Sequence, residues 1–188
     1  MAKIYFTRHG ETVTNVHKLV CGARETELTE QGHAQAIALG NELKSKIENG
    51  KLKIDKIYCS PLSRAKLTAL HISELTGIPV EEEPLLIERN FGDYEEHSRE
   101  EPEFRAALST FALSYGRNVG GESNMRCAQR IYNVLDKLTE QTKATGETYL
   151  LVAHNGLARV VNSYFHDMTN EEFGKFGITN CQLLEYEF

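Results

Sequence analysis

The sequence predicts an α/β fold: a three-layer α/β/α sandwich whose central sheet is mostly parallel, with one antiparallel edge strand. Short apolar segments of strand character alternate with segments whose apolar residues recur at helical spacing, which is typical of a parallel sheet. The chain has 188 residues, 40% of them hydrophobic, and no low-complexity tract that would mark a linker. We therefore expect one domain, 1–188, around one substantial core.

The first strand and the first helix follow from the apolar pattern. Residues 3–7 form a short apolar, aromatic run, which predicts a buried strand ending at Arg8-His9-Gly10. A polar loop follows, and a helix is predicted from Thr29 until Asn49-Gly50 supplies a stop signal. The apolar positions predicted for its buried face are Ala34, Ile37, Ala38, Leu43 and Ile47.

The second strand is predicted over 54–59. Ser60-Pro61 then predicts a helix start, with Ser60 as the N-cap and proline at the first helical position. Gly77 ends this helix, and a third short strand is expected around 78–82. The predicted buried stripe of the helix is Leu62, Ala65, Ala69 and Ile72.

Residues 84–121 interrupt the alternation of strands and helices. The segment is acidic, contains Pro102, and shows only weak helical periodicity over 104–113. We expect it to be an excursion over the sheet that covers the active site.

The rest of the chain predicts two helices and two strands. Residues 148–153 form the clearest buried strand, which ends at His154-Asn155-Gly156. Residues 182–188 close the chain as an edge strand. The apolar stripe before the buried strand is Ala128, Ile131, Leu135 and Leu138, and the stripe after it is Leu157, Val160, Val161 and Tyr164.

Composition and charge exclude several classes of protein. A net charge of -6 and a pI near 5.7 argue against a nucleic-acid-binding surface, because phosphate backbones are held by basic patches. The longest apolar stretches, such as 149–153, are far shorter than the roughly 20 residues of a membrane-spanning helix. The first residues enter a strand without the apolar core of a signal peptide, so we expect a cytoplasmic protein.

The residue types that bind metals show no ligand pattern. The four cysteines are widely scattered without a C-x-x-C pair, which predicts reduced, mostly structural thiols. Surface or core positions are expected for five histidines that lack paired spacing, namely His17, His33, His71, His97 and His166. No metal or cofactor is predicted.

Three predicted strands end in groups that bind anions or react. The first ends in Arg8-His9, the second in Ser60-Pro61 with Arg64 one turn into the helix, and a later one in His154-Asn155. Ligands of open α/β sheets bind beyond the carboxyl ends of strands, so these groups can converge. Two guanidinium groups clamp phosphate oxygens with bidentate hydrogen bonds, and a helix N-terminus adds N–H donors. The sequence therefore predicts a phosphate site.

A set of motifs follows one order along nearly the whole chain. The segments are Arg8-His9-Gly10-Glu11-Thr12, Asn15, Cys21-Gly22, Leu28-Thr29-Glu30-Gln31-Gly32, Ser60-Pro61-Leu62-Ser63-Arg64-Ala65, Glu88, Phe91-Gly92-Asp93-Tyr94-Glu95, Gly121-Glu122-Ser123 and His154. Together they resemble the histidine phosphatase superfamily, in its phosphoglycerate-mutase-like branch. R-H-G alone would be weak evidence, whereas the complete ordered set makes coincidence a poor explanation.

The resemblance implies a role for each of these residues. His9 is implied as the nucleophile and Glu88 as the proton donor, which only the resemblance singles out from its acidic neighbours. The other implied catalytic groups bind the transferring phosphoryl group with the help of Asn15; they are Arg8, Arg64 and His154. Further substrate contacts are expected from Cys21, Gly22 and Asn155. Arg89 and His97 are the expected contacts from the excursion.

The implied activity is that of a metal-independent histidine acid-type phosphatase. It would hydrolyse a phosphomonoester of a small phosphorylated metabolite through a phosphohistidine intermediate. A cofactor-dependent phosphoglycerate mutase, an isomerase, is the alternative; the compact chain, the acidic excursion and the lack of a Trp near Asn15 count against it. A non-catalytic phospho-ligand-binding module is less favoured, because the reactive groups are all present. A metallohydrolase using His9 and His154 is a further alternative.

Two positions depart from the family pattern. Glu95-Glu96-His97 stands where Glu-Gly is commoner, and Asn155 stands where Gly usually follows the second histidine. Both lie near the expected substrate entrance. The resemblance therefore leaves the leaving group open among sugar phosphates, phosphoglycerate and nucleotide-like monoesters, and it says nothing about oligomeric state.

Overall fold

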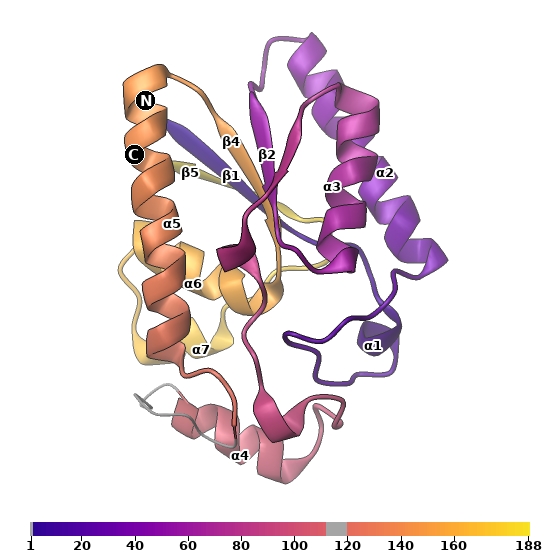
Figure 1. Cartoon of the computed structure of the whole chain (residues 1–188), viewed down its shortest axis with the longest axis vertical. Helices are drawn as coiled ribbons and strands as arrows, with labels where there is room; N and C mark the ends of the chain where they lie inside the picture. The colour runs from indigo at the N-terminus through magenta and orange to yellow at the C-terminus, as the bar shows by residue number, and fades with distance from the viewer. Residues whose placement is uncertain (1, 112–119) are drawn as a thin grey trace.

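The computed structural model describes residues 2–111 and 120–188, and its centre is a five-stranded sheet (Figure 1). The strands are β1 (Lys3–Arg8), β2 (Lys56–Cys59), β3 (Val80–Glu82), β4 (Tyr149–Ala153) and β5 (Leu183–Glu187), in the spatial order β3-β2-β4-β1-β5. Every neighbouring pair is parallel except β1 and β5, which pair antiparallel at one edge. The predicted sheet is confirmed, including its antiparallel edge strand.

Helices cover both faces of this sheet, which confirms the predicted three-layer arrangement (Figure 1). The helices α2 (Glu30–Glu48) and α3 (Ser63–Thr76) pack on one face, and α5 (Asn124–Thr145) and α6 (Asn155–Phe165) pack on the other. The shorter elements are α1 (Val13–Val16), the 3-10 turns η1 (Pro84–Leu86) and η2 (Gly92–Tyr94), α4 (Pro102–Phe111) and α7 (Asn170–Lys175). Because α1 and α7 have only 4 and 6 residues, no apolar period predicted them.

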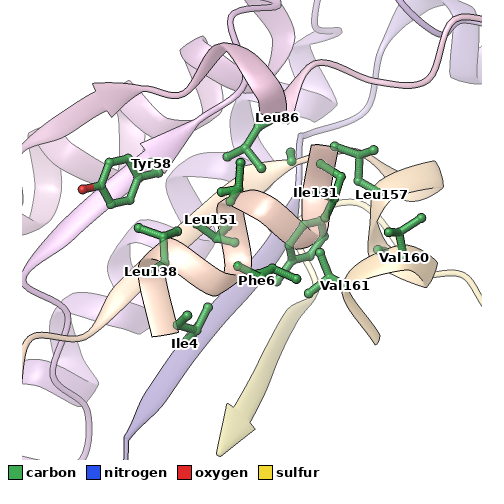
Figure 2. Packing of buried hydrophobic residues seen from close by; sticks show 14 of the residues in the cluster. Ile4, Phe6, Tyr58, Leu86, Ile131, Leu138, Leu151, Leu157, Val160 and Val161 are labelled. Carbon is green, nitrogen blue, oxygen red and sulfur yellow. The ribbon is translucent and has the colours of Figure 1, made fainter. Parts of the chain in front are cut away.

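Each face of the sheet buries its own apolar core, because side chains alternate along a strand. Ile4 and Phe6 of β1 pack with Leu151 of β4 against α5 and α6 (Figure 2). Tyr5 and Leu150 belong to the second core, under α2 and α3. All of β4 is buried, as its apolar run predicts for a central parallel strand.

The buried face of α2 differs from the prediction. The helix follows the Thr29 N-cap as expected, but Ala34, Ile37 and Ala38 are exposed. The residues it buries are Gly32, Ala36, Leu39, Gly40 and Leu43. Gly40 lies so close to α3 that a Cβ there would come within 2.7 Å of a leucine methyl group. Leu43 and Ile47 of the predicted stripe do pack into the core, so the prediction is wrong only for the first half of the helix, where small residues form the buried face.

The start of α3 also differs from the prediction. Leu62, and not Ser60, is its N-cap residue, and no side chain caps the helix. The Ser60 hydroxyl accepts the Leu62 N–H at 3.3 Å and lies 2.7 Å from His154 Nε2. The predicted buried stripe and the end of the helix at Gly77 are confirmed. Ser60 is therefore part of the strand-end region and not a helix cap.

The predicted excursion 84–121 can be followed over 84–111 and at 120 and 121. It contains η1, η2 and α4, and α4 accounts for the helical periodicity around Phe104. The end of that periodicity, at 112 and 113, lies outside the described residues.

Strand register brings three strand ends together. Both β1 and β2 pair in parallel with β4. The pairing continues one residue further, because His9 N–H donates to Ala153 O and Ser60 N–H donates to Val152 O, each at 3.0 Å. The residues that follow the three strands, His154 included, therefore lie side by side at the carboxyl edge of the sheet.

Candidate active site

His9 is held so that one ring nitrogen stays free. It is 5% exposed, and Nδ1 lies 2.7 Å from the Gly10 carbonyl oxygen. A carbonyl only accepts, so Nδ1 carries the proton and the lone pair of the neutral ring lies on Nε2. Burial lowers the pKa of His9 well below its ordinary value, and the positive charges of Arg64 and Arg8 lower it further. Near neutral pH the ring is therefore uncharged.

His154 packs against His9, with ring centroids 5.2 Å apart. It is fully buried, and its Nε2 lies 2.7 Å from Ser60 Oγ. Its Nδ1 is buried with no hydrogen-bond partner among the described residues. Burial, and then the charge of Arg64, lowers the pKa of His154 well below the ordinary value. Two neutral imidazoles thus lie next to each other beyond the ends of β1 and β4.

Main-chain oxygens orient the buried guanidinium group of Arg64. The residue is 1% exposed, and it donates through Nη1 to Arg24 O and through Nη2 to Gly22 O, each at 2.7 Å. A guanidinium group has five N–H donors, so these contacts fix its plane and leave donors for an anion.

Arg8 and Asn15 are hydrogen-bonded to each other, and other residues hold both in place. Arg8 donates through Nη1 to Ile178 O at 3.0 Å and through Nη2 to Asn15 Oδ1 at 3.2 Å. Asn15 Oδ1 also accepts from Asn180 Nδ2 at 3.2 Å, which leaves the NH2 group of Asn15 to donate elsewhere. Burial, followed by the charge of Arg99, lowers the pKa of Arg8 to about 10. A bound anion would relieve this crowding of buried positive charge.

Glu88 is a buried carboxylate held by two main-chain donors. It is 6% exposed; Oε1 accepts from Arg89 N–H at 2.8 Å, and Oε2 accepts from Gly156 N–H at 2.9 Å. Gly156 lies in the first turn of α6, where free N–H groups favour negative charge. A Cβ at Gly156 would lie 2.5 Å from Glu88 Oε1, so glycine permits this approach.

These groups line one pocket of about 870 Å³, counted out to where it opens to solvent. The predicted site residues in its lining are Arg8, His9, Asn15, Cys21, Arg64, Glu88, Arg89 and Asn155. Three predicted residues are not part of this lining. The His154 ring packs against the His9 ring, Gly22 contributes its carbonyl to Arg64, and the exposed ring of His97 lies 3.1 Å from a Glu101 oxygen.

Gly22 lies at a close crossing of two segments. Its N–H donates to the buried Glu95 Oε2 at 2.7 Å, and a Cβ would lie 2.0 Å from Arg89 O. Glu95 also accepts the N–H of Phe91 at 2.9 Å. Gly22 therefore joins the loop that orients Arg64 to the segment that carries Arg89.

The chemistry of this arrangement is that of an anion site with a nucleophile. Buried guanidinium groups and N–H donors surround a neutral imidazole with a free nitrogen, and one buried carboxylate lies in the same pocket. Donors of this kind stabilise negative charge that spreads over phosphoryl oxygens.

A model of the family described as "Histidine phosphatase superfamily (branch 1)" matches residues 4–188. The chain belongs to this superfamily. The resemblance drawn from the ordered motifs is confirmed.

Similar proteins of known sequence include phosphoglycerate mutases. A 2,3-bisphosphoglycerate-dependent phosphoglycerate mutase from Brucella anthropi is 30% identical over 179 residues, covering 92% of this chain and 85% of that protein. A mutase of the same name from Mesorhizobium japonicum is 32% identical over 168 residues, covering 88% of this chain and 68% of that protein.

Similar solved structures of the superfamily include phosphatases. A mycobacterial glucosyl-3-phosphoglycerate phosphatase in complex with VO3 has a TM-score of 0.84 and 26% identity, covering 98% of this chain and 90% of that chain. The alpha-ribazole phosphatase from Shigella flexneri has a TM-score of 0.78 and 26% identity, covering 97% of this chain and 89% of that chain.

This member of the histidine phosphatase superfamily has pocket residues to which the sequence assigned no role in the site. They are Thr12, Thr14, Val20, Phe91, Arg99, Phe104, Asn124, Cys127, Gly156, Arg159 and Val160. Asn180 was also missed; its Nδ2 donates to His9 O at 2.8 Å as well as to Asn15. A lone Arg or Asn in a helix or loop has no local pattern that marks it, so only the tertiary structure reveals these positions.

Metal-binding clusters and membrane-spanning helices are both absent from the part of the chain that the structure describes. No group of three or more His, Cys, Asp or Glu side chains there is arranged to hold a metal ion. None of the helices over 2–111 and 120–188 is long and apolar enough to cross a membrane.

Proposed function

We propose that this chain is a phosphomonoester hydrolase that acts on a small phosphorylated metabolite through a phosphohistidine intermediate on His9. The observation that carries the proposal is the neutral His9 imidazole with a free Nε2, in a pocket it shares with the guanidinium groups of Arg8 and Arg64. A neutral imidazole attacks phosphorus, and guanidinium donors stabilise the charge that the transition state spreads over the phosphoryl oxygens.

In the first step, Nε2 of His9 forms a bond to phosphorus while the ester P–O bond breaks. The leaving oxygen takes the bonding pair, and protonated Glu88 supplies the proton that turns it into an alcohol. The groups proposed to hold the phosphoryl oxygens are Arg8, Asn15, Arg64 and His154.

In the second step, water attacks the phosphorus of the phosphohistidine. The Glu88 carboxylate takes one proton from this water, and the N–P bond breaks with its electron pair returning to Nε2 of His9. Inorganic phosphate leaves, and both residues return to their starting protonation states. The two main-chain N–H groups on Glu88 support this role, because they hold the carboxylate in one position.

The leaving group is proposed to contact Cys21, Arg89 and Asn155, which line the pocket. Asn155 is itself fixed, because its Oδ1 accepts from Ile178 N–H at 2.8 Å. For Gly22 we propose an indirect role, since its carbonyl orients Arg64.

Phosphoglycerate mutase is the second candidate. It is favoured by the mutase relatives at 30% and 32% identity, whereas the phosphatases among the solved structures favour hydrolysis. The two reactions share the phosphohistidine and differ in the acceptor, which is water in one and a phosphoglycerate in the other. A direct mutase assay with 3-phosphoglycerate, run beside phosphate release, separates them.

The nucleophile is tested with p-nitrophenyl phosphate. We expect His9→Ala to lower kcat/KM by at least about 10⁴-fold, because no other group replaces the nucleophile. The exposed His17 provides a matched control, and His17→Ala should keep full activity. A folded His9→Ala variant that releases phosphate at the normal rate would overturn the proposal.

The same assay tests the expected independence from metal ions. Hydrolysis should survive a chelator and should be inhibited by vanadate, which mimics the transferring phosphoryl group. Loss of activity on chelation, with recovery on adding a divalent metal, would favour the metallohydrolase instead. The single domain, the covering role of 84–121, the cytoplasmic location and the lack of nucleic-acid or membrane binding stay predictions.

A further inference from the structure

Glu95 is a buried acidic side chain that has no part in the two proposed chemical steps. It is 7% exposed and lies outside the pocket lining. Three main-chain N–H groups donate to its carboxylate: Oε2 accepts from Gly22 at 2.7 Å, and Oε1 accepts from Phe91 at 2.9 Å and from Ala23 at 3.2 Å. Burying a carboxylate is costly unless hydrogen bonds compensate, so these contacts hold the side chain in one position.

One peptide group joins Glu95 to the buried guanidinium group of Arg64. The carbonyl of Gly22 accepts from Arg64 Nη2 at 2.7 Å. The N–H of the same peptide group belongs to Ala23, and it donates to Glu95 Oε1. A peptide group is planar, with its C=O and N–H pointing in opposite directions. Arg64 and Glu95 therefore bind the two sides of one plane, and rotation of that plane would break both hydrogen bonds.

The adjoining residues extend this connection in both directions. The Gly22 N–H also donates to Glu95, and the second carbonyl on Arg64 is that of Arg24, which accepts from Nη1 at 2.7 Å. The Phe91 N–H ties the same carboxylate to the 84–101 segment. The plane of the Arg64 guanidinium group therefore depends on where residues 22–24 lie, and Glu95 fixes two of these three residues.

The loop that orients Arg64 keeps other main-chain contacts that do not involve the Glu95 carboxylate. Val20 N–H donates to His97 O, and Glu96 N–H donates to Val20 O, each at 2.8 Å. A change confined to the Glu95 side chain leaves these bonds in place. We therefore expect such a change to tilt the peptide group on Arg64 without detaching the loop.

We infer that Glu95 is a positioning residue for the proposed reaction, because it fixes the peptide group that orients Arg64. Since Glu95 does not line the pocket, its effect on the rate is exerted through the guanidinium group. A guanidinium group donates two parallel hydrogen bonds to phosphoryl oxygens only while its plane is correctly oriented. The inference rests on the proposed function, because it concerns the transfer of the phosphoryl group to His9.

Glu95→Gln tests the inference with p-nitrophenyl phosphate as the substrate. The amide keeps the shape of the carboxylate, but its NH2 group cannot accept, so at least one main-chain N–H loses its acceptor. We expect kcat/KM to fall by at least about tenfold, because a misplaced guanidinium donor stabilises the transition state less. p-Nitrophenolate departs without protonation, so a displaced Glu88 would not lower this rate. Glu96→Gln makes the same change at the exposed neighbouring residue and should keep the wild-type kcat/KM.

A double-mutant cycle with Arg64→Met separates positioning of Arg64 from a general structural role. When the guanidinium group is absent, Glu95→Gln should change kcat/KM less than about twofold. A tenfold loss that persists in the Arg64→Met background would overturn the inference, and so would a folded Glu95→Gln variant with the wild-type kcat/KM. Thermal unfolding checks that each variant is folded.

A second variant covers the case in which Glu95→Gln does not fold. Glu95→Asp keeps the charge, but its carboxylate is one methylene group shorter and cannot reach all three N–H groups. It should lower kcat/KM in the wild-type background and change it less than about twofold beside Arg64→Met. Losses that multiply in this second cycle would likewise overturn the inference.

Failure of this inference is distinguishable from failure of the proposed function. If the wild type hydrolyses p-nitrophenyl phosphate through His9 but the losses from Glu95→Gln and Arg64→Met multiply, only the positioning role of Glu95 is wrong. If the wild type releases no phosphate, the proposed hydrolase is wrong, and the positioning role is wrong with it.

Discussion

Four arginines of the pocket lining form two groups that are held differently: a first cationic group, Arg8 and Arg64, and a second cationic group, Arg89 and Arg159. In the first, Arg8 and Arg64 donate to main-chain oxygens of two separate loops, at Ile178 and at Gly22 and Arg24, so the sheet and its adjoining turns fix them. In the second, Arg89 is held mainly from the start of α5, and Arg159 projects from α6 with a donor that has no partner among the described residues. Arg8 ends β1 and Arg64 lies in the first turn of α3, shortly after β2, whereas Arg89 and Arg159 depend on how α5 and α6 meet the 84–101 segment.

We propose that the first group binds the phosphoryl group of every substrate and that the second group determines which substrates are accepted. Groups held by strand ends cannot move without disturbing the sheet, which suits a phosphoryl site that must be the same for every substrate. Groups on helices and loops can change from protein to protein while the sheet stays intact. We therefore expect substitutions in the first group to affect all phosphate esters, and substitutions in the second to affect only some.

Among the pocket arginines, the largest effect is predicted for Arg64→Met. Loss of the buried guanidinium group should lower kcat/KM by about 10³-fold for p-nitrophenyl phosphate, glycerol 3-phosphate and 3-phosphoglycerate alike, because the donor stabilises the transferring group itself. Steady-state phosphate release on the three esters measures this. A substrate-dependent loss would contradict the division of the pocket into two groups.

Arg64→Lys serves as the companion variant. Lysine keeps the charge but cannot donate to the Gly22 and Arg24 oxygens from one planar group, so most of the activity should still be lost. Thermal unfolding of both variants checks that the fold is retained.

The sequence predicted the pocket residues near strand ends better than those on helices. The five strands were predicted, and so was the convergence of Arg8, His9, Arg64 and His154, because each lies at or shortly after the end of an apolar run. Arg159 was not predicted, since nothing in its local sequence distinguishes an arginine that lines a pocket from one that faces solvent.

Errors in the predicted elements have a similar cause. The first half of the buried face of α2 was misassigned because Ala36 and Gly40 are buried there, Gly40 against the adjacent helix α3, and small residues give a weak apolar signal. Ser60 was assigned as a helix cap from local rules, but its hydroxyl lies against a histidine 94 positions away in sequence. Local patterns predict elements; they do not predict which distant partner a side chain finds.

Gly156→Ala tests the hydrogen bond from the Gly156 N–H to the Glu88 carboxylate. The new Cβ would meet the flexible end of Glu88 at 2.5 Å, so the carboxylate should swing away from the Gly156 N–H while the fold survives. We expect kcat for glycerol 3-phosphate to fall by about 10²-fold, because its alkoxide needs the proton. The rate for p-nitrophenyl phosphate should change much less, since its leaving group departs without protonation.

Gly174→Ala is the matched control. A Cβ at Gly174 meets nothing within 4 Å, so activity on both esters should be unchanged. Equal losses on the two esters for Gly156→Ala would show that Glu88 is not the proton donor.

Stability should depend on pH through the two histidines of the strand-end site. His9 and His154 have pKa values lowered well below the ordinary value, mainly by burial, so the folded state keeps both rings neutral where the unfolded chain takes up protons. The unfolded state is then favoured as the pH falls below about 6.5, by about 1.4 kcal/mol per pH unit for each ring. The free energy of unfolding should therefore be independent of these rings above that pH and should decrease below it.

Urea unfolding in phosphate-free buffer, from about pH 7.5 to about pH 5.5, measures this slope. For His154→Asn, the dependence of the unfolding free energy on pH should be weaker by the contribution of one ring. His17→Gln, at an exposed position, should keep the wild-type slope. A wild-type free energy of unfolding that rises as the pH falls through this window would contradict the assignment of two neutral buried rings.

The smallest effect is predicted for Glu96→Gly, in the loop that follows η2. Glu96 has φ 72, in the left-handed region that favours glycine, and it stands where the family pattern commonly has glycine. Glycine should relieve about 1 kcal/mol of backbone strain and lose part of this to the entropy of the unfolded chain. We expect a net gain of about 0.5 kcal/mol in the free energy of unfolding, with unchanged kcat/KM.

Removing the Glu96 side chain should cost little stability. Its carboxylate lies 3.9 Å from Arg24 Nη1, and both side chains are exposed, so the ion pair contributes little. Lys18→Gly, at another exposed residue with φ 53, provides a comparison and should also be neutral or stabilising. If Glu96→Gly lowered kcat/KM for 3-phosphoglycerate while leaving glycerol 3-phosphate unaffected, the loop itself would contribute to selectivity, and the boundary of the second cationic group would have to include it.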